Sequence, residues 1–208
     1  MKSAEVIRGL YAITPDESDT GVLLDKVACA LRGGASVLQY RNKTANASLK
    51  RQQAAALAAL CHSHSATFIV NDDVALALEV DADGVHLGGE DGDLAEARRR
   101  IGPGKLLGAS CYNRMELAVA AKAAGADHVA FGAAFASPTK PAAVHAPLDL
   151  YRRAAAEIGL PVIAIGGITM DNAPSLIAAG VDAIAVITAL FDASDAEQKA
   201  ASFASLFN

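Results

Sequence analysis

Eight short apolar runs recur along this chain, each separated from the next by a longer, Ala-rich stretch of helical character. Strands that are apolar throughout and alternate with helices indicate a parallel sheet covered by helices. Eight such units predict an α/β fold of the (β/α)8 TIM-barrel type, in which the sheet closes on itself. The predicted strands are Gly9–Thr14, Ser36–Arg41, Thr67–Val70, Gly84–Leu87, Leu106–Ala109, His128–Phe131, Val162–Ile165 and Ala183–Ile187.

The connections between these strands follow a weak internal repeat. The phrases "RGGASVLQYR", "EVDADGVHLG", "AAGADHVAFG" and "AAGVDAIAVI" each end a helix at Gly or Asp and then enter an apolar strand, as Gly-rich helix C-caps do. The chain is short for eight units, so we expect a single domain over residues 1–208. The predicted helices are Gly21–Arg32, Ala47–His62, Asp73–Val80, Leu94–Ile101, Arg114–Ala124, Leu148–Ile158, Asp171–Ala179 and Ala196–Phe207.

A doubly wound open sheet is the alternative fold. It usually has five or six strands, and its glycine fingerprint follows the first strand. In this chain the glycine pair "IGG" follows the seventh predicted strand, which favours the barrel.

Composition excludes several classes of partner. The net charge of -5, the few aromatic residues and the absence of Trp argue against nucleic acid. Three widely spaced cysteines, Cys29, Cys61 and Cys111, fit neither a disulfide framework nor a zinc site. The charged N-terminal segment is unlike a secretory signal, and no apolar run reaches the length of a membrane span. We expect a cytoplasmic protein with small-molecule partners and no membrane, and the sequence is compatible with a homo-oligomer.

Polar residues gather at the carboxyl ends of the predicted strands, where barrels of this type carry their functional sites. Asp72 and Asp91 follow neighbouring strands, which lie about 4.8 Å apart in a sheet. Two adjacent carboxylates suit Mg²⁺ when a substrate phosphate supplies further oxygens. The alternative for either residue is a helix N-cap, a role that we expect of Asp73.

Three cations are expected at the same end of the barrel. Arg41 and Lys43 alternate with Gln39 after the second strand, and Lys140 lies in the long loop after the sixth. A lone exposed Lys is usually only solvated, and a surface ion pair contributes little. Three cations near two carboxylates instead match a pyrophosphate bridged by Mg²⁺.

The glycine pair Gly166 and Gly167 indicates a second anion site. A phosphate approaches the main chain closely where no Cβ intervenes, and barrels often bind phosphate after their seventh and eighth strands. Ile187 and Thr188 follow the eighth strand and supply N–H groups, and Ser137 and Thr139 are further candidate donors. The alternative is a tight turn from strand to helix, which explains one glycine better than two.

Nucleophilic and zinc chemistry receive little support. No His is placed to activate Cys111, so an inert thiol is expected. His86 lies within the fourth predicted strand as a hydrogen-bonded core or rim residue. His128 begins the sixth, at the end of the barrel opposite to the site.

Six stretches together carry a family resemblance. They are "LYAIT" at 10–14, "QYRNK" at 39–43, "ND" at 71–72, "DGVHLGGED" at 83–91, "FGAAFASPTK" at 131–140 and "AIGGI" at 164–168. In this order and spacing the chain resembles the thiamine phosphate synthase family over essentially its whole length. The resemblance implies a barrel transferase of thiamine biosynthesis. It would join 4-amino-2-methyl-5-(diphosphooxymethyl)pyrimidine to 4-methyl-5-(2-phosphooxyethyl)thiazole and release pyrophosphate.

The resemblance also implies roles for individual residues. Arg41, Lys43 and Lys140 would be catalytic, and Asp72 and Asp91 would hold one Mg²⁺ per subunit. The pyrimidine pyrophosphate would be bound by Gln39, Tyr40, Arg41, Asn42, Lys43, Asn71, Ser110 and Lys140. The thiazole phosphate would be bound by Ser137, Pro138, Thr139, Gly167, Ile187 and Thr188.

Four positions depart from the commonest family pattern. Tyr40 replaces the usual Leu, Gly89 stands where Gln is common, and Thr188 stands where Ser is common. The stretch "ASCYN" lacks the His that often follows the serine by two residues. None of these departures removes a charge assigned to the metal or the pyrophosphate.

The resemblance implies a dissociative mechanism, with which the assigned cations, metal site and hydrogen-bond donors agree. Two alternatives remain at this point: a thiazole tautomerase-like barrel, and a non-catalytic thiamine phosphate-binding protein. The first would not need the full pyrophosphate and metal set. The second would keep a phosphate cradle without two carboxylates beside three cations.

Overall fold

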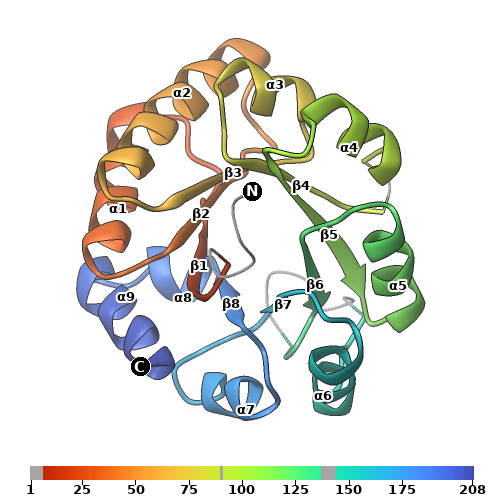
Figure 1. The fold of residues 1–208 in the computed structure, drawn as a ribbon. Coiled ribbons are helices and arrows are strands. Elements are labelled where there is room, and N and C mark those ends of the chain that lie inside the picture. Colours follow the sequence, from red (N-terminus) through yellow and green to blue (C-terminus); the bar gives the residue numbers. More distant parts are fainter. Residues whose placement is uncertain (1–6, 90, 137–143) are drawn as a thin grey trace.

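Eight parallel strands close into a barrel in the computed structural model, which describes residues 7–89, 91–136 and 144–208. Each strand pairs with its sequence neighbours, and β1 pairs with β8 to complete the ring (Figure 1). The predicted (β/α)8 class is therefore confirmed. The strands are β1 Gly9–Ile13, β2 Val37–Tyr40, β3 Thr67–Asn71, β4 Gly84–Leu87, β5 Leu106–Tyr112, β6 His128–Gly132, β7 Val162–Ile165 and β8 Ala183–Val186.

Helices surround the barrel and follow the strands in turn (Figure 1). A four-residue helix after β8, Thr188–Phe191, was not predicted because it is too short for a periodic signal. The helices are α1 Thr20–Arg32, α2 Ala47–Ser63, α3 Val74–Glu79, α4 Leu94–Ile101, α5 Met115–Ala123, α6 Leu148–Glu157, α7 Ala173–Ala178, α8 Thr188–Phe191 and α9 Ala196–Ala204, with a 3₁₀ turn at Ser205–Phe207.

Asp side chains begin several of these helices. Asp73 accepts a hydrogen bond from Leu76 N and caps α3, which confirms the role expected of it. Asp93 caps α4 by accepting from Glu96 N. Asp91 therefore does not cap this helix, and its carboxylate can take part in a site at the carboxyl ends of the strands.

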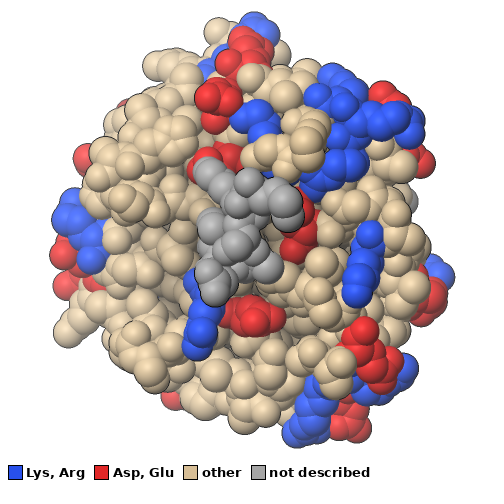
Figure 2. All heavy atoms as spheres, in the orientation of Figure 1, with Lys and Arg blue, Asp and Glu red and all other residues tan. Residues whose placement is uncertain are grey.

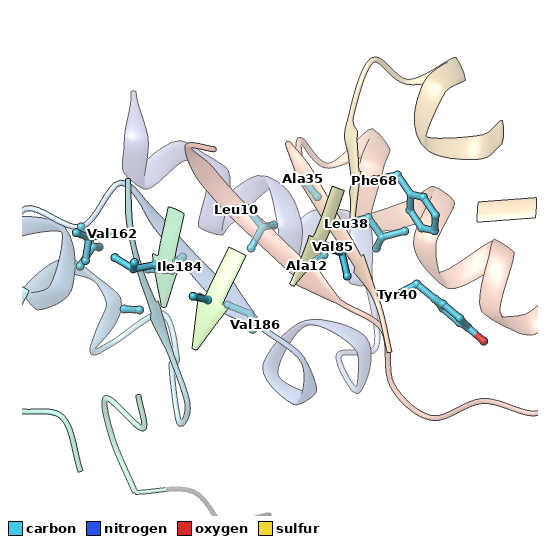
Figure 3. Packing of buried hydrophobic residues seen from close by; sticks show 14 of the residues in the cluster. Leu10, Ala12, Ala35, Leu38, Tyr40, Phe68, Val85, Val162, Ile184 and Val186 are labelled. Atoms are coloured by element: carbon cyan, nitrogen blue, oxygen red, sulfur yellow. The ribbon is translucent and has the colours of Figure 1, made fainter. Parts of the chain in front are cut away.

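Successive strand residues alternate between the helix layer and the barrel interior, as the pleat requires. Outward-facing residues form a large apolar cluster between sheet and helices, and Figure 3 shows Leu10, Leu38, Phe68 and Val85 in this layer. A smaller cluster fills the interior: Ile7, Tyr11, Ile13, Val37, Ile69, Leu106, Ala130, Ile163, Ala183 and Ala185. The two clusters hold the strand ends on a rigid frame.

The successive βα units run clockwise in Figure 1. Right-handed crossovers then require the strands to point away from the viewer, so this is the end at which they begin. Figure 2 shows the same face, where basic and acidic side chains lie interspersed around the rim. Ion pairs such as Arg98–Asp127 and Lys105–Asp81 account for part of this mixing. Within the described residues, no helix is both long enough and apolar enough to cross a membrane.

Candidate active site

Arg41 is held firmly at the end of β2 by residues from the end of β1. The Thr14 hydroxyl donates to Arg41 O and accepts from Arg41 N, both at 2.8 Å. The Asp16 carboxylate lies 3.3 Å from Arg41 Nη1 and accepts from Lys43 N at 2.9 Å. Asp16 thus orients the segment that carries both predicted cations. Asp16 was not among the predicted site residues, although it lies only two residues after the first predicted strand.

Three other residues of this segment are held by hydrogen bonds inside the fold. The Tyr40 hydroxyl donates to Gln53 Oε1 at 2.9 Å in the helix layer. Asn42 Nδ2 donates to the same oxygen and to Glu17 O, while Asn42 Oδ1 accepts from the following turn. Gln39 is buried in the barrel and donates to the Tyr11 hydroxyl. These bonds shape the loop that presents Arg41 and Lys43, and Tyr40 and Asn42 also contribute to the lining of the cavity described below.

The two predicted metal-binding carboxylates come together beside a lysine. Lys43 Nζ lies 3.5 Å from Asp72 Oδ2. The pKa of Asp72 is raised, first by desolvation and then by its hydrogen bond and charge repulsion with Asp91, while Lys43 opposes the shift. A carboxyl whose negative form is disfavoured by a neighbouring carboxylate is one that a cation would stabilise.

The backbone aims both carboxylates by unusual means. Asp72 has a φ of 64°, a left-handed conformation that is uncommon for a residue other than Gly and often found at functional sites. Asp91 Oδ2 accepts from Gly88 N at 3.0 Å, and the Tyr112 hydroxyl accepts from Gly89 N at 3.1 Å. Tyr112 therefore supports the loop that carries Asp91, a role that sequence analysis missed because the residue gave no charge signal.

A cavity of about 520 Å³ opens beside these groups. Asn71 lies at the end of β3 and lines the cavity, together with Lys43, Asp72 and Asp91. Two further cations that sequence analysis did not select also line it. They are Lys50 on α2 and Arg100 on α4. Their positions within helices did not indicate in the sequence that their side chains reach the cavity.

The donor set fits Mg²⁺. Among the described residues no group of three or more His, Cys, Asp or Glu side chains converges as a complete metal cage. Two carboxylates at the rim of an open cavity are the arrangement expected for a hard cation that also takes water and substrate phosphate oxygens. The cations Lys43, Lys50 and Arg100 make the same cavity suitable for a pyrophosphate.

Ser110 lies on β5 and faces the barrel interior near this cluster. Its Oγ is 2.9 Å from His86 Nε2, and His86 Nδ1 is 3.4 Å from His128 Nε2. His86 is thus a hydrogen-bonded core histidine, as expected. His128 begins β6, as predicted, but its side chain reaches inward far enough to stack on His86, with ring centroids 5.6 Å apart.

Both glycines of the "IGG" turn have structural reasons for being glycine, which corrects the expectation that a turn would explain only one. Gly166 and Gly167 have φ values of 98° and 65°. A Cβ on Gly167 would lie 2.5 Å from Phe135 O and 2.7 Å from Ala136 O. A Cβ on Gly166 would lie 2.7 Å from the Ala133 Cβ. The turn packs against the segment after β6, so the glycine pair alone is weaker evidence for phosphate than the sequence indicated.

The remaining predicted phosphate contacts are only partly within the described residues. Ile187 precedes α8, and Thr188 is the first residue of that helix, where N–H groups have no intrahelical partner. Asn172 Nδ2 donates to Gly167 O at 2.9 Å and braces the turn. Ser137, Pro138, Thr139 and Lys140 lie outside the residues that the structure describes.

Comparison with known proteins identifies one family. The thiamine monophosphate synthase family matches residues 10–190. The chain is 55% identical over 202 residues to the thiamine-phosphate synthase of Aromatoleum aromaticum, covering 97% of each chain. It is 54% identical to that of Methylobacillus flagellatus, covering 97% of this chain and 96% of the relative. A solved structure, thiamine phosphate pyrophosphorylase from Pyrococcus furiosus, superimposes with a TM-score of 0.87 at 35% identity, covering 98% of this chain and 96% of that one.

Proposed function

The chain belongs to the thiamine monophosphate synthase family, and from this premise we propose that the two substrates bind in two separate subsites at the carboxyl ends of the strands. It is a transferase of thiamine biosynthesis, a thiamine-phosphate synthase. The side chains at β2, β3 and β4 hold the pyrimidine pyrophosphate. The backbone turns after β7 and β8 hold the thiazole phosphate. Residues 1–208 form one catalytic domain.

The reaction is a dissociative substitution. The C–O bond between the pyrimidine methylene and the pyrophosphate breaks, and both electrons leave with the pyrophosphate oxygen. The aminopyrimidine stabilises the resulting benzylic-type cation, and the thiazole nitrogen then donates its lone pair to form the new C–N bond. The protein positions the two substrates and keeps water from the cation.

Arg41 and Lys43 neutralise the departing pyrophosphate, with Lys140 from the loop after β6 as a third cation. Their charge matters most where negative charge develops on the leaving oxygen. Asp16 keeps Arg41 and the Lys43 backbone in place. Lys50 and Arg100, which line the same cavity, add to its positive field. In this arrangement the leaving group departs without a proton from a dedicated general acid.

Asp72 and Asp91 hold one Mg²⁺ per subunit. When bound, the ion supplies Lewis-acid stabilisation of the pyrophosphate oxygens. Lys43 opposes the rise in the pKa of Asp72 that burial and Asp91 cause, and Gly88 N and Tyr112 keep the Asp91 loop beside it. Asn71 completes the polar rim at the end of β3. Ser110 faces the pyrimidine ring from β5.

The thiazole phosphate is held mainly by main-chain groups. Gly167, Ile187 and Thr188 contribute to this subsite, and Ser137, Pro138 and Thr139 are its further contacts by their place in the family pattern. Thr188 offers its hydroxyl in addition to its N–H. Such a cradle binds an anion through oriented backbone dipoles and needs no charged side chain.

The observation that carries the proposal is the pairing of Asp72 with Asp91 beside Lys43 at the rim of the cavity. The test supplies both substrates with and without Mg²⁺ and follows pyrophosphate release. We expect release only when both substrates and the metal are present. Conversion of the thiazole phosphate alone would favour the tautomerase alternative. Binding of both ligands without release would favour the non-catalytic binder.

A further inference from the structure

Three neighbouring strands build a polar chain inside the barrel, and the proposed roles use only the Ser110 end of it. His86 on β4, Gly108 on β5 and His128 on β6 are paired partners in the sheet register, so they lie at one level. Ser110 lies two residues beyond Gly108, one layer closer to the strand ends where the substrates bind. The hydrogen-bonded sequence runs from His128 through His86 to Ser110. β4, β5 and β6 are adjacent in Figure 1.

Gly108 makes this contact sterically feasible. A Cβ at this position would overlap both His128 Nε2 and His86 Nδ1. The φ of Gly108 is not positive, so its backbone conformation does not require a glycine. Its lack of a side chain is therefore explained by the two imidazoles that meet across it, and the three residues form one built unit.

Both imidazoles are buried side by side in the barrel interior, where one charged ring would be costly and two adjacent charged rings more so, and each is therefore neutral. One of the two must then donate to the other. If His86 Nδ1–H donates, His128 has to carry its proton on Nδ1, a fully buried atom without a hydrogen-bond partner among the described residues. If His128 Nε2–H donates, His128 Nδ1 carries no proton and only its acceptor lone pair lacks a partner. A buried N–H group without an acceptor is rarer and costlier than a buried lone pair without a donor. The arrangement in which His128 Nε2–H donates is therefore favoured.

We infer that His128 is a positioning residue that sets the donor direction of the hydrogen bonds from His128 through His86 to Ser110. His128 Nε2–H donates to His86 Nδ1, and His86 Nε2–H donates to Ser110 Oγ. Because its oxygen is already occupied as an acceptor, Ser110 presents its hydroxyl proton to the substrate. The inference rests on the proposed function for the identity of that substrate: Ser110 selects a heteroaromatic ring with an acceptor nitrogen, as an aminopyrimidine has.

The direct test measures the tautomers in the full-length wild-type protein. Two-bond ¹H–¹⁵N correlation spectra of histidine-labelled protein at neutral pH distinguish a ring protonated at Nδ1 from one protonated at Nε2. The His86→Gln and His128→Gln variants assign the two buried rings. We expect both to be Nε2–H tautomers. A Nδ1–H tautomer in either ring would overturn the inference, whether or not the protein is active.

A kinetic test separates direction from packing. His128→Phe keeps a ring against His86 but removes the donor, and His128→Gln returns an N–H. In His128→Phe we expect the KM for the pyrimidine pyrophosphate to rise roughly fivefold, the loss of one neutral hydrogen bond. The KM for the thiazole phosphate should stay unchanged, and His128→Gln should recover most of the loss. Equal losses in both variants, or equal rises for both substrates, would indicate packing alone and refute the positioning role.

The two tests keep this inference apart from the proposed function. Failure to release pyrophosphate in the wild-type protein would reject the proposed function and leave the tautomers to be judged by the spectra. Normal turnover with a Nδ1–H tautomer would reject only the role of His128.

Discussion

The two halves of the barrel mouth are built from different materials. At β2, β3 and β4 the site consists of charged side chains, with Lys43 3.5 Å from Asp72 and other cations around one cavity. At β7 and β8 it consists of backbone turns, with two glycines pressed against the segment after β6. The barrel interior differs in the same way. Two histidines and a serine project into the interior from β4, β5 and β6. From β7 and β8 the interior side chains are instead apolar: Ile163, Ile165, Ala183 and Ala185.

This difference teaches where function and stability are coupled. A charged side chain at a strand end can be changed with little effect on the core, so its loss should affect catalysis first. A backbone turn cannot be changed without moving the chain itself, so its loss should affect both. The following predictions test that contrast, beginning with the largest expected effect.

The first prediction concerns the charged half. Asp91→Asn keeps the size of the side chain but removes a charge that we propose binds Mg²⁺, and we expect turnover to fall by at least about 100-fold. The melting temperature should change little. Asp93→Asn is the matched control two residues away, because Asp93 caps α4 and has no assigned role in the site. Steady-state assays over a range of Mg²⁺ concentrations check this, and full activity of Asp91→Asn would remove the metal assignment.

The second prediction uses acid to probe the interior beneath the charged half. Burial lowers the pKa of His86 to about 4, whereas the unfolded chain takes up this proton near the ordinary value. Between those values the unfolded state binds more protons, so stability falls as the pH falls. For His86 alone the loss is roughly 3 kcal/mol from about pH 7 to about pH 4.

Urea unfolding at the two pH values, in the wild type and in His86→Gln, measures this contribution. The variant cannot take up that proton and should lose less stability in acid than the wild type. Ile163→Val provides a comparison from the apolar side of the interior, and its acid sensitivity should equal that of the wild type. Equal acid sensitivity in all three proteins would contradict the prediction.

The third prediction concerns the backbone half. Gly167→Ala places a Cβ 2.5 Å from Phe135 O at a φ of 65°, so both strain and overlap arise. We expect a loss of about 2 kcal/mol in the free energy of unfolding. Binding of the thiazole phosphate should weaken more than that of the pyrimidine pyrophosphate.

Gly159→Ala is the control for this change. Its φ is also 65°, but a Cβ there lies only at ordinary contact distance, 3.4 Å from the Lys122 Nζ, so this variant reports the cost of the positive φ without the overlap. Thermal unfolding and calorimetric titration of each substrate compare the two variants. If Gly159→Ala loses as much stability as Gly167→Ala, then the close approach to the Phe135 carbonyl does not contribute to the loss.

The smallest expected effect lies at the edge of the charged half. Tyr112→Phe removes the hydroxyl that accepts from Gly89 N and so loosens the loop that carries Asp91. One neutral hydrogen bond corresponds to roughly a fivefold increase in the Mg²⁺ concentration needed for half-maximal rate. Saturating Mg²⁺ should restore the rate. An unchanged Mg²⁺ requirement would show that Gly88 N alone holds Asp91 in place.

The sequence predicted the fold because its signals are local and repeated. Eight apolar runs with helical stretches between them have few ways to bury both faces of a sheet, and the strand order follows from sequential right-handed crossovers. Element ends were less exact. β5 continues to Tyr112, beyond the predicted end at Ala109, because Ser110 and Tyr112 still pair with β6 across a shift in register.

The sequence by itself determined the barrel, the end of it that carries the polar residues, and the carboxylates Asp72 and Asp91 as metal candidates. Only the tertiary structure decided which side chains share a contact. Asp16 reaches Arg41 across the β1–β2 pair, and Gly108 lets His86 meet His128 across β5. These contacts depend on register and on the direction in which each side chain leaves its strand. The physical reason is that local patterns specify which face a residue occupies, whereas closure of the barrel determines what lies opposite it.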